Sequence, residues 1–153
     1  MTAVHETQGG AVLSPTRRRI ALMALALGGF GIGSAEFVSM GLLSMIAQDF
    51  SITEEQAGLI ITVYALGVVI GAPLITAFTG RIPRRRLLLI LMAAFVVGNA
   101  LSMFDSSYTM LLVARFLAGL PHGAYFSVAG LSAASMAPEG QRGRAVAFVG
   151  MGL

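Results

Sequence analysis

Hydrophobic residues occur along the chain in long runs separated by short polar segments. Four of these runs are long enough to cross about 30 Å of hydrocarbon as helices. They cover approximately residues 20–46, 57–79, 87–104 and 108–136. Lipid offers no partner to an unpaired backbone group, so helices are the expected structure at these lengths. The pattern predicts an all-α, polytopic membrane helix bundle.

The two ends of the chain differ from these runs. Residues 1–19 are mixed and polar, and we expect a flexible cytoplasmic tail there. A last apolar run covers residues 145–153, which is too short to span a bilayer. The sequence therefore resembles an N-terminal transmembrane bundle truncated in its fifth helix, with four complete spans before it.

Turn and packing signals support these boundaries. Two capping boxes, Ser51–Glu54 and Thr53–Gln56, fit the start of the second span, and residues 105–107 form a polar turn before the fourth. Small residues recur at four-residue steps, which lets membrane helices approach closely. We expect such packing at Gly29 and Gly33, Gly67 and Gly71, Ala94, Gly98 and Ser102, and Gly119, Gly123 and Ser127. Pro73 and Pro121 lie inside spans, where proline is expected to bend a helix.

Composition argues against a soluble enzyme. The chain is 56% hydrophobic and 11% charged, whereas soluble domains carry about 25% charged residues. It has no cysteine and two isolated histidines, so neither thiol chemistry nor a metal centre is expected. No phosphate-binding glycine loop with its lysine is present. We expect no enzymatic activity, no cofactor and no nucleic-acid partner.

The distribution of arginine predicts the orientation. Nine of the ten arginines lie in the N-terminal tail and in the segments 80–86 and 138–144, and the other two connections contain only acidic charges. The positive-inside rule places the arginine-rich segments in the cytoplasm of a bacterial inner membrane. An alternative is a cleaved secretory signal ending near Ala35, but apolar sequence resumes directly after Glu36.

Two charged residues inside the spans are the main functional candidates. Glu36 and Arg115 lie about 15 Å and about 10 Å from the outer ends of their helices at 1.5 Å per residue. A charge within the hydrocarbon costs at least about 2.5 kcal/mol and usually faces a cavity or a partner. We expect Glu36 to take up and release a proton beside Arg115. The alternative is a static ion pair that fixes helix packing.

Three further polar residues lie in apolar surroundings. His122 is two turns after Arg115, on nearly the same helix face. Asn99 and Tyr64 belong to the third and second spans. Each is a candidate for lining a substrate cavity, and interhelical hydrogen bonding is the alternative role.

Several segments together resemble the major facilitator superfamily, in particular its bacterial sugar-efflux and drug:proton antiporter branch of AraJ-like proteins. The matching segments are 33–37 with 40–43, 64–67 with 71–73, 81–86, and 114–123. The resemblance implies twelve helices in two halves, alternating access to a central cavity, and proton-coupled efflux of a sugar or drug. It links the positions of Glu36 and Arg115 to proton movement. The partners would be the lipid bilayer, protons, a small-molecule substrate and the missing C-terminal part, and the fragment alone is expected to be inactive.

The cytoplasmic loop motif of this family is matched in part. Arg81, Arg84 and Arg85 occupy its basic positions, but Gly80 replaces the aspartate that is thought to latch the cytoplasmic gate. The resemblance therefore implies a different latch in this chain.

Two other functions remain open from the sequence. A four-helix small multidrug transporter also has a glutamate in its first helix and acts as a dimer. A non-transporting membrane anchor or assembly subunit would be indifferent to the loss of either buried charge.

Overall fold

The computed structural model describes residues 14–104 and 107–152 as a bundle of helices, with no strand among these residues. The helices are α1 (Pro15–Gly41), α2 (Leu43–Asp49), α3 (Glu54–Phe78), α4 (Arg84–Leu101), α5 (Tyr108–Met136) and α6 (Arg142–Gly150). The all-α membrane bundle predicted from the apolar runs is confirmed.

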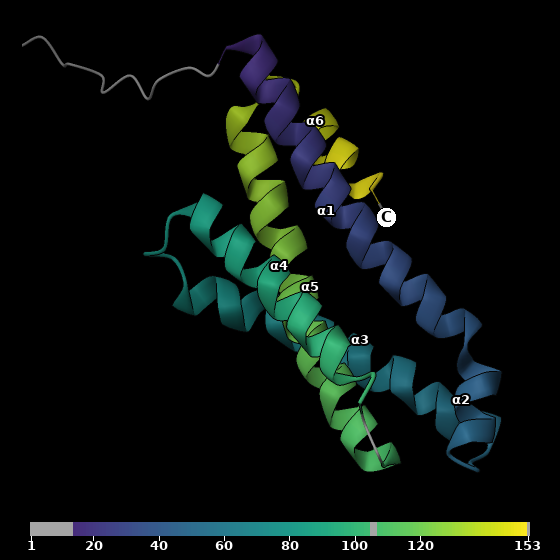
Figure 1. Cartoon of the computed structure of the whole chain (residues 1–153). Coiled ribbons are helices and arrows are strands. Elements are labelled where there is room, and N and C mark those ends of the chain that lie inside the picture. Colours follow the sequence, from purple (N-terminus) through teal and green to yellow (C-terminus); the bar gives the residue numbers. More distant parts are fainter. Residues whose placement is uncertain (1–13, 105–106, 153) are drawn as a thin grey trace, which may run out of the picture.

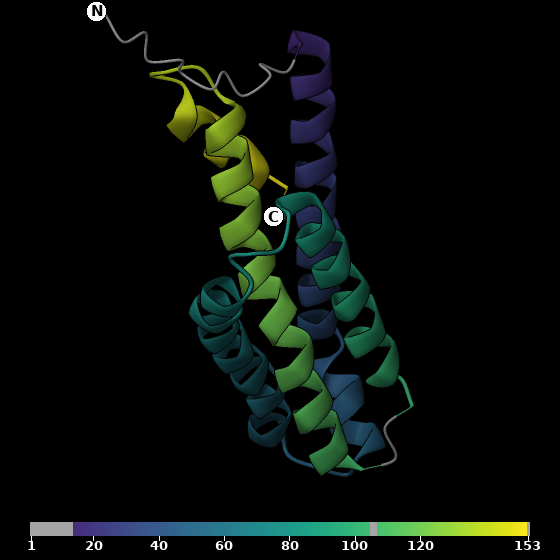
Figure 2. The same ribbon diagram turned by 90° about the vertical axis from the view of Figure 1, so that its left-hand side faces the viewer.

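Helix α5 is the central element of the bundle. It packs against α1, α3, α4 and α6, and its most extensive contact is with α3. Figures 1 and 2 show that α5 runs from one end of the bundle to the other. It ends beside the start of α1, and the α2–α3 and α4–α5 connections lie at the opposite end. Buried positions extend along α5 from Leu111 to Ala133, so this helix provides most of the core.

Three helices are long and apolar enough to cross a membrane, namely α1, α3 and α5. Helix α4 has 18 residues, and its first three are Arg84, Arg85 and Arg86, so its apolar portion is shorter than those of the other three. The fifth apolar run forms the short helix α6, which begins with Arg142 and packs against α1 and α5.

The first helix differs from the prediction at both ends. The expected tail of residues 1–19 is shorter, because α1 already begins at Pro15, and residues 1–13 lie outside the described residues. The side chain of Ser14 accepts a hydrogen bond from the backbone of Arg17, and proline suits the first helical turn because it needs no donor there. The expected span 20–46 is also interrupted at Leu42, which separates α1 from α2.

Local capping explains where two other helices start. Thr53 and Gln56 form a reciprocal capping box at the start of α3, whereas the preceding Ser51 has a positive φ of 51° and makes the turn out of α2. The Ser107 side chain caps α5 at the backbone of Met110. The other two residues of that predicted polar turn, Asp105 and Ser106, lie outside the described residues.

Candidate functional site

The candidate site is assembled where α3 and α5 meet backbone to backbone. A Cβ atom on Gly67 would overlap the carbonyl oxygen of Phe116, and one on Gly119 would overlap the carbonyl oxygen of Tyr64. Gly71 and Gly123 make equivalent contacts one turn further along. The four glycines singled out in the sequence therefore form a continuous seam, which allows side chains just before it to meet.

Arg115 lies immediately before this seam and is the central charge of the site. Only 5% of its surface is exposed. Its Cζ atom lies 4.4 Å from the centroid of the Tyr64 ring, which is the geometry of a cation–π contact. Its Nη1 atom donates a hydrogen bond of 3.2 Å to Asn99 Oδ1. Its Nε atom is buried and has no hydrogen-bond partner among the described residues.

Tyr64 connects Arg115 to His122. The Tyr64 hydroxyl lies 2.8 Å from Nδ1 of His122, and both side chains are buried. The His122 ring also packs against Phe126, with 5.3 Å between ring centroids. Four residues that were singled out from the sequence are thus connected by direct contacts in one cluster, namely Arg115, Tyr64, Asn99 and His122.

Asn99 joins this cluster from α4. Its Nδ2 atom donates to the carbonyl oxygen of Phe95 at 2.8 Å, while its Oδ1 atom accepts from Arg115. Both ends of the amide are therefore used, which fixes the direction in which its oxygen faces the guanidinium.

Glu36 approaches the cluster from α1 and is half-buried. Its charge acts on both Arg115 and Tyr64. Within the described residues, no ion pair joins the Glu36 carboxylate to the guanidinium. The arrangement differs from the static ion pair considered from the sequence, because the two charges are near each other but not in direct contact.

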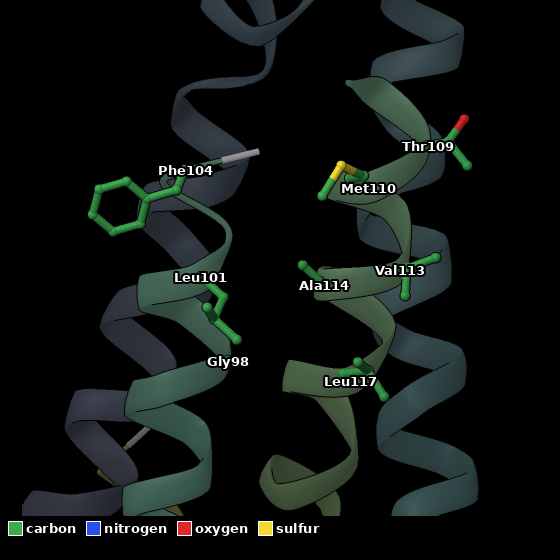
Figure 3. Close-up of a pocket in the computed structure, with 8 residues that line it drawn as sticks. All are labelled: Gly98, Leu101, Phe104, Thr109, Met110, Val113, Ala114 and Leu117. Carbon is green, nitrogen blue, oxygen red and sulfur yellow. The ribbon is translucent and has the colours of Figure 1, made fainter. Parts of the chain in front are cut away.

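An open apolar groove lies next to the cluster, between the end of α4 and the start of α5 (Figure 3). Its volume is about 400 Å³. The lining includes Leu101, Phe104, Val113 and Leu117, together with Gly98 and Ala114, which are the chain neighbours of Asn99 and Arg115. Its surface is almost entirely apolar, so it contains none of the charged or hydrogen-bonding groups of the cluster.

Of the three arginines in the basic loop motif, Arg84 is bonded to the bundle. Arg84 Nη1 donates to the carbonyl oxygen of Leu131 at 3.2 Å and to the hydroxyl of Ser135 at 3.0 Å. Arg81 and Arg85 are exposed and make no such bond to the described residues.

The bond between Tyr125 and α1 was not predicted from the sequence. The Tyr125 hydroxyl donates to the carbonyl oxygen of Leu25 at 2.9 Å and lies in a notch above Gly28, where a Cβ atom would overlap it. The signal available in the sequence was a tyrosine one turn after His122 together with a glycine pair in the first span. No group of three metal-ligating side chains occurs in the described part of the chain.

The chain is similar to several known proteins. The family model of the Major Facilitator Superfamily matches residues 15–153. The inner membrane transport protein YdhP of Escherichia coli K12 is 45% identical over 86% of this chain and 34% of its own length. The putative transporter AraJ of the same strain is 42% identical over 86% of this chain and 34% of its own. The uncharacterized MFS-type transporter YtbD of Bacillus subtilis 168 is 42% identical over 87% of this chain and 34% of its own length. The chain thus spans about a third of the length of these relatives.

Proposed function

The chain belongs to the Major Facilitator Superfamily, and we propose that it is the N-terminal part of a proton-coupled transporter that exports a small organic molecule, a sugar or a drug. The transporter would work by alternating access in a bacterial inner membrane, with the N-terminus in the cytoplasm. Two relatives are named as an inner membrane transport protein and a putative transporter, which supports transport across a bacterial inner membrane.

The observation that carries the proposal is the proximity of Glu36 to Arg115 inside a membrane bundle. Burial of a charge in hydrocarbon costs about 2.5–3.5 kcal/mol on insertion scales, so unpaired intramembrane charges point to a function. Here a half-buried carboxylate acts electrostatically on a buried guanidinium without bonding to it. A carboxylate in this position is able to exchange a proton without breaking an ion pair.

Each side chain then has a distinct role. Glu36 takes up and releases the proton, and the fixed charge of Arg115 stabilises the carboxylate whenever the proton is absent. Asn99 and the Tyr64 ring hold the guanidinium in place. His122 is buried beside Tyr64, so its expected role in lining a substrate cavity stays a prediction.

The test is transport by the full-length protein in everted membrane vesicles, with radiolabelled arabinose and the cation ethidium as probes. We expect an imposed pH gradient to drive accumulation of one probe by the wild type and to drive none by Glu36→Gln. Glu54→Gln is the matched control, because Glu54 is exposed at the start of α3. Undiminished accumulation by Glu36→Gln would remove Glu36 from the mechanism.

The same measurement separates the two alternatives considered from the sequence. Loss of transport on removing the segment beyond residue 153 supports the two-half transporter and contradicts a self-sufficient four-helix dimer. Failure of the wild type to move either probe under a pH gradient, with the protein folded in the vesicles, would favour an anchor or assembly subunit.

A further inference from the structure

Tyr64 makes two contacts of different kinds with its two neighbours on α5. The guanidinium of Arg115 lies over the face of its ring, and the Nδ1 atom of His122 lies at its hydroxyl. The Tyr64 side chain therefore lies between the permanent cation of Arg115 and the imidazole of His122, which is able to change its protonation.

These contacts decide the direction of the Tyr64–His122 hydrogen bond. A cation over the ring withdraws electron density from the phenol oxygen, which makes the hydroxyl a better donor and a poorer acceptor. A neutral imidazole has one donor and one acceptor nitrogen, and the bond made by one nitrogen sets the role of the other. With Tyr64 as donor, Nδ1 of His122 accepts and its proton is carried on Nε2.

We propose that Tyr64 is a positioning residue that lets the location of Arg115 set the tautomer of His122. While Arg115 lies on the ring, Tyr64 donates to Nδ1 and His122 stays in the single tautomer protonated at Nε2. When Arg115 leaves the ring, the Tyr64 oxygen becomes a better acceptor, and the proton of the neutral His122 ring is then able to occupy Nδ1 as well as Nε2. The use of this role in transport rests on the proposed function, whereas the effect of Tyr64 on the His122 tautomer does not.

Within the described part of the chain, few other charged side chains lie near His122 that could set its tautomer. Among the described residues, the charged side chains that act on Tyr64 are Glu36 on α1 and Arg115 on α5, and the acidic residues of α3, Glu54 and Glu55, lie in its first turn. The charged residues of α4 and α6 are arginines at the starts of those helices. Tyr125 bonds to the backbone of Leu25 and not to His122.

The test uses the full-length protein labelled with ¹⁵N-histidine in lipid nanodiscs, with His122→Gln to assign the His122 signals. We expect the wild type to show Nδ1 as an unprotonated acceptor and Nε2 as protonated. Tyr64→Phe keeps the ring beneath Arg115 and removes the hydroxyl, so its His122 should lose the single tautomer and populate both. Arg115→Gln, with Tyr64 retained, should also give a mixture.

Tyr125→Phe is the matched control, because it removes a buried tyrosine hydroxyl of the neighbouring turn and should leave the wild-type pattern. A wild-type His122 protonated at Nδ1, or an unchanged pattern in Tyr64→Phe, would overturn the proposal. An unchanged pattern in Arg115→Gln would overturn it as well, because the tautomer would then not depend on Arg115.

A transport assay separates this proposal from the function that it serves. We expect Tyr64→Phe to change the shape of the pH profile of transport and Tyr125→Phe to preserve it. Absence of transport in the wild type, with the expected tautomer present, contradicts the transport function alone. Identical pH profiles in wild type and Tyr64→Phe, with transport present, contradict the role of Tyr64.

Discussion

The carbonyl oxygen of Tyr64 lies so close to Gly119 that a Cβ atom at Gly119 would overlap it. This contact places the turn of α3 that carries Tyr64 directly against the turn of α5 that follows Arg115. The cation–π contact between the two side chains thus depends on a backbone approach that only glycine permits at this position.

We therefore predict opposite effects for two glycine-to-alanine substitutions. Gly119→Ala forces α3 and α5 apart and should destabilise the bundle by about 1–3 kcal/mol, as overpacking of a tight core does. Gly31→Ala adds a Cβ where no other atom lies within 4 Å, so it should stabilise α1 by about 0.5–1 kcal/mol. The measurement is the midpoint of SDS-induced unfolding in detergent micelles, followed by near-ultraviolet circular dichroism of the tyrosines. Equal unfolding midpoints for the two variants would contradict the close approach of α3 and α5 at Gly119.

The apolar runs predicted the long helices because lipid forces an uninterrupted apolar segment to be helical. The predicted spans 57–79 and 108–136 differ little from α3 and α5. The break at Leu42 was not predictable, because apolar residues continue through it and glycine is common within membrane helices.

The candidate site was predictable in its residue types but not in its contacts. Polar side chains in apolar runs singled out Arg115, Asn99 and Tyr64 because burial without partners is costly. Which atom bonds to which depends on the rotation of α3 and α4 about α5, and the tie from Tyr125 to Leu25 depends on a notch formed by two distant helices. Periodicity along one helix contains no such information.

The hydrogen bond between Asn99 and Arg115 should appear as an energetic coupling. Asn99→Leu leaves a buried guanidinium without its acceptor and should cost about 1–3 kcal/mol. Once Arg115 is replaced by leucine, the same change at Asn99 should cost less, with a coupling of about 0.5–3 kcal/mol. A double-mutant cycle of unfolding midpoints measures it. Strict additivity of the two substitutions would show that the bond contributes nothing to stability.

The orientation is testable because the sequence has no cysteine, so that each introduced cysteine is the only thiol. We expect a cysteine at Ile82 or Glu139 to be protected from a membrane-impermeant maleimide in intact cells and to react after permeabilisation. A cysteine at Asp49 should react in both conditions, because Asp49 ends α2 and the α2–α3 connection lies at the end of the bundle opposite the end of α5. The reverse labelling pattern would place the arginine-rich segments outside, against the positive-inside rule.

The start of α4 and the end of α5 are joined by Arg84, whose Nη1 atom donates to Leu131 and Ser135. Arg84→Ala removes the donor to both Leu131 and Ser135, so the two helix ends should open more often. Hydrogen exchange followed by mass spectrometry should show faster exchange in residues 87–91 and 132–137, by roughly 2- to 10-fold for a net bond of about 0.5–1.5 kcal/mol. Arg85→Ala removes an equal charge that makes no bond to the described residues and should leave both segments at the wild-type rate. Equal acceleration in the two variants would mean that loop charge, and not the bond from Arg84, protects this end of the bundle.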